Sequence, residues 1–224
     1  MPTVGGWPVG NYLANPGNRA MVLSLFAEHV YLSLVPIVLA VVISIPLGWL
    51  AHKRSWATAA LLGTSSVVYT IPSLALFVLL PAVLGTQILD PLNIVVALTI
   101  YTVALLVRST ISALEALPDR VLDAATAMGF QPVRRFLTVE LPLAVPVIVA
   151  GLRVAVVSNV SLVTIGALIG IGGLGQLFTG GFATGNVPEM TVGLVLTAAL
   201  ALVVDAVVVA GRYAGTPWLR AVKS

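Results

Sequence analysis

The sequence predicts an all-α, polytopic membrane protein with about five transmembrane helices. Of its 224 residues, 59% are hydrophobic and only 8% are charged, whereas soluble domains carry about 25% charged residues. Several long runs contain no charged residue at all, and a helix needs about 20 apolar residues to cross a bilayer. This composition excludes an ordinary soluble enzyme, a nucleic-acid-binding domain and a disordered chain. The lipid bilayer is therefore an expected partner, and nucleic acid is not.

The expected spans are apolar runs bounded by charged, proline-containing or glycine-rich sequence. The first ends at the basic run 52–54, the second contains Pro72, and Asp90-Pro91 marks a turn before the third. After the fourth span, the composition of residues 170–185 predicts a glycine-rich loop. The five expected spans cover residues 30–51, 57–84, 92–114, 141–169 and 190–211.

The segment 115–140 interrupts this apolar pattern. It holds seven of the chain's nineteen charged residues, so we expect it to lie in water or against a partner. Within it, residues 122–127 predict a short helix that ends at Gly129. Residues 134–139 predict a second short amphipathic helix, which is expected to end before Pro142.

Five spans place the two termini on opposite sides of the membrane. The basic residues of 52–54, 120–135 and 212–223 fall on one side, which the positive-inside rule makes cytoplasmic, while Arg19 is the only base on the other. We therefore expect an extracytoplasmic N-terminal segment (1–25), a transmembrane domain (26–211) with a cytoplasmic loop at 115–142, and a cytoplasmic tail (212–224). The alternative is six membrane segments, with a helix lying along the membrane around residues 19–28.

The sequence contains no recognisable catalytic or metal-binding motif. It has no cysteine, and its only histidines, His29 and His52, lie at opposite ends of the first span. Neither Lys53 nor Lys223 ends a G-x-x-x-x-G-K-[ST] loop, so we expect no ATP site in this chain. We accordingly expect no catalytic residue, metal or cofactor.

The run 170–175 formally matches G-x-G-x-x-G, which in dinucleotide-binding proteins follows a β-strand. Here a predicted transmembrane helix precedes it. A non-helical turn is the better interpretation, because Gly172, Gly173 and Gly175 permit positive φ and close backbone approach. Such backbone at the membrane edge must be buried in protein or line a water-filled path.

Arg153 and Asp205 are ionisable residues within predicted spans. Counted from the cytoplasmic ends of their spans, they lie roughly 16 Å and 9 Å deep, close enough to form a pair. Intramembrane ions usually face the protein interior or a cavity. The pair is either a pathway or gating contact or a structural ion pair between helices. Arg108, by contrast, is expected to extend to the cytoplasmic interface.

The run from Tyr69 to Ser73 is the most suggestive interruption of a span. Pro72 frees a backbone carbonyl and bends the helix, and neighbouring hydroxyl groups can bond to freed backbone groups. Tyr69, Pro72 and Ser73 therefore mark either a pathway element or a plain kink.

The segment 115–142 also carries a motif with fixed spacing. Asp-Ala-Ala at 123–125 is followed after three residues by a glycine, and after nine more by Val-Glu-Leu-Pro at 139–142. This resembles the E-A-A loop of ABC-importer permeases (E-A-A, three residues, G, nine residues, I-x-L-P), with Asp for Glu and Val for Ile. The coupling residues implied by this resemblance are Asp123, Ala124, Ala125, Gly129, Val139, Leu141 and Pro142.

Residues 28–34, 69–76 and 172–175 look like the permeases of osmoprotectant importers, which carry glycine betaine, choline, carnitine or proline. The resemblance implies a MetI-like type I ABC importer permease of the inner (plasma) membrane that is not itself an enzyme. It implies three kinds of protein partner: cytoplasmic ATPase subunits docked on the loop, a second permease subunit (a copy or a paralogue), and an extracytoplasmic substrate-binding protein. The alternatives are an amino-acid or methionine importer permease, an ion-coupled secondary transporter, or a non-transporting membrane scaffold.

Overall fold

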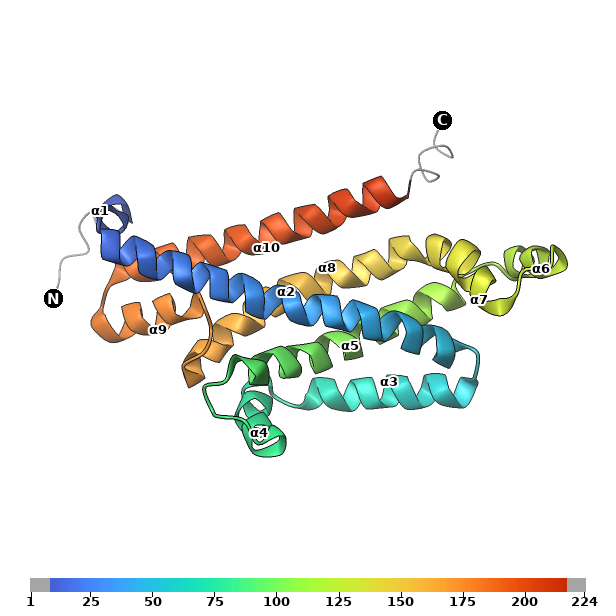
Figure 1. The fold of residues 1–224 in the computed structure, drawn as a ribbon, viewed down its shortest axis with the longest axis horizontal. Helices are drawn as coiled ribbons and strands as arrows, with labels where there is room; N and C mark the ends of the chain where they lie inside the picture. The colour runs from blue at the N-terminus through green and yellow to red at the C-terminus, as the bar shows by residue number, and fades with distance from the viewer. Residues whose placement is uncertain (1–8, 217–224) are drawn as a thin grey trace. The chain divides into compact units, whose positions relative to one another are not determined.

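A computed structural model describes residues 9–216, and all regular structure in this part is helical, which confirms the expected all-α class (Figure 1). The predictions for residues 1–8 and 217–224, including the basic residues of the tail end, lie outside the described residues. The α-helices are α1 (Val9–Ala14), α2 (Pro16–His52), α3 (Ser55–Thr70), α4 (Ser73–Leu84), α5 (Pro91–Glu115), α6 (Asp119–Ala127), α7 (Pro132–Arg135), α8 (Leu141–Gly166), α9 (Gly175–Thr184) and α10 (Val187–Gly215). A π-helix, η1 (Phe136–Glu140), precedes α8, and a 3₁₀-helix, η2 (Ala167–Ile169), follows it.

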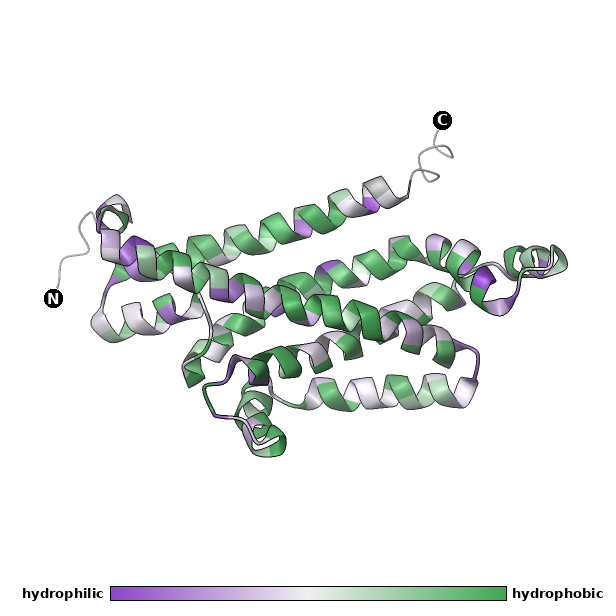
Figure 2. Cartoon of the chain, in the orientation of Figure 1, coloured by the Kyte–Doolittle hydropathy of each residue, from purple (hydrophilic) through white to green (hydrophobic). Residues whose placement is uncertain are grey.

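The expected spans correspond to long apolar helices. Within residues 9–216, four helical runs are long and apolar enough to cross a membrane: α2, α5, the continuous run Pro132–Ile169, and α10 up to Tyr213. Apolar residues dominate along these helices (Figure 2). The span expected at 57–84 corresponds to α3 and α4, which together pass the same test but bend by 102° at their junction, the geometry of a broken span or a re-entrant loop.

Helix α2 is one unbroken helix of 37 residues. Its N-terminus is capped by Asn15, whose Oδ1 accepts the Gly17 N–H at 2.8 Å. Residues 19–28 therefore belong to the first span helix and do not form a separate helix lying along the membrane. Since 37 residues extend about 55 Å and the hydrocarbon core is about 30 Å thick, α2 must project beyond the bilayer.

Side-chain caps explain where two other long helices begin. Asp90 Oδ1 accepts the Leu92 N–H at 2.9 Å, with Pro91 in the first helical position of α5. Asn186 donates to Glu189 Oε2 at 3.0 Å and accepts the Glu189 N–H at 3.4 Å, which fixes the start of α10. The predicted turn at Asp90-Pro91 is thus a helix cap.

Two local predictions were wrong. Residues 170–185 are not all loop, because Gly175–Thr184 forms α9. A Cβ at Gly181 would lie 2.6 Å from Met190 Cγ, so glycine allows α9 to pack closely on α10, and this packing overrides the poor helix propensity of glycine. The helix at 134–139 also does not end before Pro142: the chain stays helical through η1 into α8.

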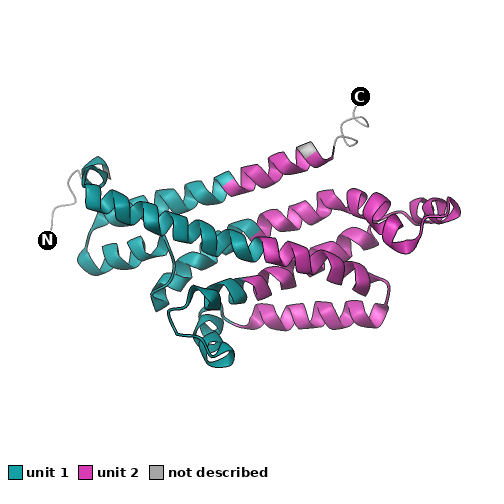
Figure 3. Cartoon of the chain, in the orientation of Figure 1, with its two compact units in different colours: residues 1–37, 72–98, 156–203 teal, residues 38–71, 99–155, 204–224 magenta. Residues whose placement is uncertain are grey.

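Contact patterns divide the chain into two compact units (Figure 3). Unit 1 comprises Met1–Ile37, Pro72–Leu98 and Val156–Val203, and unit 2 comprises Val38–Ile71, Thr99–Ala155 and Val204–Ser224. Unit 1 has a core cluster around Leu32, Phe77 and Ile94. In unit 2, Phe136 stacks on Trp49 with 4.6 Å between ring centroids, within a core cluster that includes buried residues of α5 and α8.

Candidate functional site

Helix α6 presents one side of the Asp-Ala-Ala motif and buries the other. Asp123 and Ala124 are exposed, whereas Ala125 is 2% exposed. Of the two alanines, only Ala124 therefore lies on the exposed side of α6, and the side chain of Ala125 lies inside the loop. Nearby, Met128 and Leu137 are exposed apolar side chains.

Gly129 closes α6 in a left-handed conformation with φ of 82°. Its N–H donates to the Thr126 carbonyl at 2.9 Å, and the Phe130 N–H donates to the Ala125 carbonyl at 3.2 Å. These two bonds form a Schellman motif, which satisfies carbonyls at the helix end and favours glycine at this position. The spacing of three residues between Asp-Ala-Ala and Gly is thus the spacing of a short helix and its C-terminal cap.

An ion pair that the motif did not reveal joins the two halves of the loop. Arg135 Nε contacts Glu140 Oε1 at 2.6 Å, and the Glu140 side chain is 1% exposed. The Arg135 Nη1 also donates to Thr126 Oγ1 in α6 at 2.8 Å. One guanidinium therefore connects α6 to η1. Arg135 and Glu140 are five residues apart, which is also the spacing that the backbone hydrogen bonds of a π-helix such as η1 join.

The second half of the motif forms the entry into α8. The Leu141 N–H bonds to the Phe136 carbonyl, five residues back, and Pro142 has no N–H with which to continue the helical ladder. Val139, Leu141 and Pro142 are half-buried. Leu141 packs against the cluster that contains Phe136. These residues therefore attach the loop to the helices of unit 2.

Arg153 of α8 and Asp205 of α10 form the ion pair that their depths predicted. Arg153 Nε contacts Asp205 Oδ1 at 2.7 Å, and Nη2 contacts Oδ2 at 2.8 Å. The geometry is bidentate, which holds both side chains in one orientation. The pair remains accessible, with 48% of the Arg153 side chain and 22% of the Asp205 side chain exposed.

The glycine turn after η2 makes close contacts within unit 1. Gly173 has φ of 46°, and a Cβ there would lie 2.6 Å from His29 N and Cβ. A Cβ at Gly172 would likewise overlap the backbone of Ala167, and a Cβ at Gly175 would lie 2.6 Å from the Thr164 carbonyl oxygen. The predicted reason for these glycines, close backbone approach, is confirmed.

His29 is fully buried although it is an ionisable residue near the start of the first span. Its ring Nε2 lies 3.1 Å from the Val160 carbonyl oxygen, so Nε2 carries the hydrogen and donates. The hydroxyl of Ser33 donates to the His29 carbonyl at 2.7 Å. The contact between His29 and Gly173 holds α2 against the segment that follows α8. A histidine near the end of a span gave no sequence signal for this contact.

The junction of α3 and α4 lies at the residues predicted to interrupt the second span. Thr70 Oγ1 donates to the Val67 carbonyl at 2.7 Å, as expected for a hydroxyl near a helix end. In unit 2, the hydroxyl of Tyr101 donates to the Ile71 carbonyl, and the rings of Tyr69 and Tyr101 meet edge to face at 6.0 Å. Pro72 and Ser73 begin α4 in unit 1.

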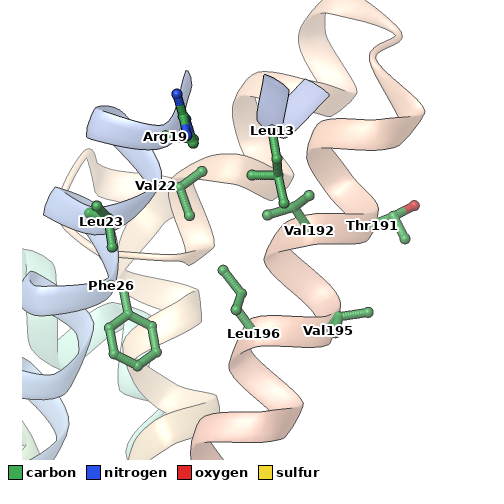
Figure 4. Close-up of a pocket in the computed structure, with 9 residues that line it drawn as sticks. All are labelled: Leu13, Arg19, Val22, Leu23, Phe26, Thr191, Val192, Val195 and Leu196. Atoms are coloured by element: carbon green, nitrogen blue, oxygen red, sulfur yellow. The ribbon is translucent and has the colours of Figure 1, made fainter. Parts of the chain in front are cut away.

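Unit 1 also contains an apolar groove of about 470 Å³ (Figure 4). Among the described residues that line it, Arg19 is the only charged one and none is a carboxylate, so these residues offer a cationic solute no counter-charge. None of the predicted site residues lies in it. Its lining residues are Leu13, Arg19, Val22, Leu23, Phe26, Thr191, Val192, Val195 and Leu196. Elsewhere in residues 9–216, no three His, Asp or Glu side chains gather as metal ligands.

Comparisons with known proteins agree on one family. Residues 40–214 match the model of the binding-protein-dependent transport system inner membrane component. The chain is 35% identical over 191 residues to the osmoprotectant import permease protein OsmW of Salmonella typhimurium, covering 84% of this chain and 88% of that protein. It is 31% identical over 200 residues to the glycine betaine/carnitine/choline transport system permease protein OpuCD of Bacillus subtilis, covering 89% and 85%.

A third relative is longer than this chain. The ergothioneine transport permease/ergothioneine binding protein EgtU of Helicobacter pylori is 39% identical over 167 residues, which cover 75% of this chain but only 30% of that protein. Among solved structures, the inward-facing MetNI methionine ABC transporter superposes with a TM-score of 0.79 at 24% identity, over 90% of this chain and 99% of that chain. This likeness shows the fold. The chain therefore belongs to the family of binding-protein-dependent transport system inner membrane components.

Proposed function

We propose that this chain is the permease subunit of an ATP-driven importer for osmoprotectants such as glycine betaine, carnitine, choline or proline. The similarity to OsmW and OpuCD over more than four fifths of the chain carries this proposal. Glycine betaine, carnitine, choline and ergothioneine share a trimethylammonium group. The similarity to EgtU makes ergothioneine a second candidate solute of the same chemical class.

ATP hydrolysis would belong to separate cytoplasmic subunits, because this chain has no phosphate-binding loop. We place the docking surface for those subunits on the loop 115–142, where Asp123, Ala124, Met128 and Leu137 are exposed. Exposed apolar side chains on a charged loop suit a protein partner. Ala125 and Gly129 would act by shaping α6.

The contacts of unit 2 suggest how a movement of α6 reaches the membrane. Arg135 ties α6 to η1 through Thr126 and Glu140. Phe136 in η1 stacks on Trp49 near the end of α2. A shift of the docked loop would therefore be transmitted to α8 and α2 rather than absorbed by a flexible connection. This arrangement supports alternating access driven by the ATPase subunits.

The remaining assignments follow from the family and the distribution of charge. The chain would pair with a second permease subunit, as a homodimer or with a paralogue, and an extracytoplasmic binding protein would deliver the solute. Its N-terminal segment 1–25 would lie outside, the loop 115–142 and the tail from residue 212 in the cytoplasm, and 26–211 would form the permease domain. Tyr69, Pro72, Ser73, the glycine turn at 172–175 and the pair Arg153–Asp205 would belong to the solute path or its gate.

Uptake in cells tests the proposal. Cells with and without the chain would be given labelled glycine betaine, carnitine, choline, proline, ergothioneine or methionine at high osmolarity. The proposal predicts that uptake of at least one of the solutes other than methionine requires the chain. Dependence of methionine uptake alone would contradict it and favour an amino-acid importer. An ion-coupled transporter would instead retain uptake when the loop 115–142 is altered.

A further inference from the structure

Arg108 is exposed in a stretch of α5 that is otherwise buried or half-buried. Between Tyr101 and Ile111, all of which the structure describes, it is the only exposed residue. It lies seven residues before the end of α5 at Glu115, or roughly 10 Å along the helix. Within the described chain its guanidinium forms no salt bridge with a carboxylate. An uncompensated cation inside a span is costly and usually functional.

The Arg108 side chain does not follow the expected course toward the cytoplasmic interface. Its Nη2 donates to Ser66 Oγ in α3 at 2.8 Å, and Ser66 lies eleven residues from the start of α3 at Ser55, or roughly 16 Å along the helix. Helical side chains lean toward the helix N-terminus, which for α5 is the end away from Glu115. The guanidinium therefore points toward the middle of the span.

The surface beside Arg108 does not resemble a lipid-facing surface. Between Ala59 and Thr70, six of the exposed residues of α3 are small or hydroxylated: Ala59, Ala60, Gly63, Thr64, Ser66 and Thr70. Apart from Pro46, the exposed residues of α2 in the same unit are large and apolar: Val38, Leu39, Val42, Ile43, Leu47 and Leu50. Small and hydroxylated residues line helix contacts or watery paths within membranes.

The aromatic ring of Tyr69 lies one helical turn along α3 from Ser66, the residue to which the guanidinium is bonded. Tyr69 follows Ser66 by three residues on α3, so the two share a face, and 49% of Tyr69 is exposed. The ring of the buried Tyr101 meets the Tyr69 ring edge to face, and the Tyr101 hydroxyl donates to the Ile71 carbonyl. A cation can bind over the face of a tyrosine ring within about 6 Å.

We propose that Arg108 and Tyr69 form a subsite for a zwitterionic solute in the translocation path. The carboxylate would bind the guanidinium, and the trimethylammonium group would lie over the Tyr69 ring. The inference rests on the proposed function and narrows it, because the two groups match a molecule with both charges, such as glycine betaine or carnitine. Choline has the cation alone and would be repelled by Arg108.

The test measures solute moved per ATP hydrolysed in vesicles that contain the complete importer with its binding protein. Arg108→Gln is expected to lower glycine betaine uptake per ATP about tenfold, because a charge-assisted bond to the carboxylate is lost, while ATP hydrolysis stays near the wild-type rate. Tyr69→Leu is expected to lower glycine betaine uptake per ATP about threefold. Tyr69→Phe is expected to lower it less than twofold, because phenylalanine keeps the π face.

Val67→Ala, a change at an exposed neighbour on α3, is the matched control and should leave uptake per ATP unchanged. The subsite would be overturned if Arg108→Gln moved as much solute per ATP as the wild type. It would also be overturned if the variant lost uptake and ATP hydrolysis in parallel, because that result indicates a structural role for Arg108. If Arg108→Gln does not insert, Tyr69→Leu decides: unchanged uptake per ATP overturns the subsite. Absence of uptake of any zwitterionic trimethylammonium solute by the wild-type protein would overturn the subsite, and absence of all osmoprotectant uptake would refute the proposed function with it.

Discussion

Substitutions at Gly129 separate a backbone requirement from a requirement for space. A Cβ at this position would meet nothing within 4 Å, yet φ is 82°. Size alone should therefore cost nothing in the isolated subunit, whereas the left-handed conformation costs an L-residue about 1–2 kcal/mol. Asparagine tolerates this conformation better than alanine, and a β-branched residue tolerates it least. The expected order of loop stability is Gly, then Asn, then Ala, then Val.

The magnitude follows from the cost of the left-handed conformation, and the two bonds of the turn show which amides report it. Gly129→Ala should destabilise the closed turn by about 1–2 kcal/mol, and Gly129→Val by up to about 3 kcal/mol. A change of 1–2 kcal/mol alters a population about five- to thirty-fold. The amides of Gly129 and Phe130, which bond to the carbonyls of Thr126 and Ala125, should therefore exchange hydrogen faster by that factor in Gly129→Ala.

Amide hydrogen exchange of residues 126–130 and ATP-driven uptake by the same variants provide the assay. Both should follow the order given by tolerance of positive φ, with Gly129→Asn closest to wild type. If Gly129→Asn is as impaired as Gly129→Val, or if activity follows side-chain size, the reasoning from backbone conformation is refuted. A requirement for space against the ATPase partner would then be the better explanation.

Three further predictions concern contacts elsewhere. Reversing the charge of Arg153 or of Asp205 alone should reduce uptake, and reversing both should restore it; failure of the double variant to recover would show that the pair does not act directly. Gly173→Ala should lower stability by about 2–4 kcal/mol, because its Cβ would overlap the His29 backbone at a positive φ. Thermal unfolding of the solubilised protein measures this, and an unchanged midpoint would contradict the contact. Glu140→Gln should weaken the loop by about 1–2 kcal/mol, because a charge-assisted bond becomes a neutral one; unaltered hydrogen exchange in α6 would count against that bond.

Several features could be predicted because they depend on local sequence or simple geometry. Long uncharged runs predict the spans, since the bilayer core admits little else. Gly129 could be assigned as a helix terminator because only glycine adopts its conformation without strain. The pair of Arg153 and Asp205 could be inferred from depth, because the rise per residue of a helix is constant.

Other features depend on tertiary packing and gave no local signal. The burial of Ala125, the bond between Arg135 and Glu140 and the π-helix η1 are features that the sequence pattern does not indicate. The helix α9 forms despite its glycines, because they permit close packing. The direction of Arg108 depends on a hydroxyl supplied by another helix. Helical periodicity places such a residue on a face, but only the neighbouring helix decides its partner.

ATP-driven uptake of labelled glycine betaine in reconstituted vesicles tests the central claim most directly. The vesicles would contain this chain with its ATPase and binding protein, and a parallel set would carry Gly129→Val. Our account predicts uptake that requires ATP, the binding protein and an intact loop, and that falls sharply in the variant although the variant inserts normally. Uptake that continues without ATP, or at the wild-type rate in Gly129→Val, would contradict an ATP-coupled permease that is driven through this loop.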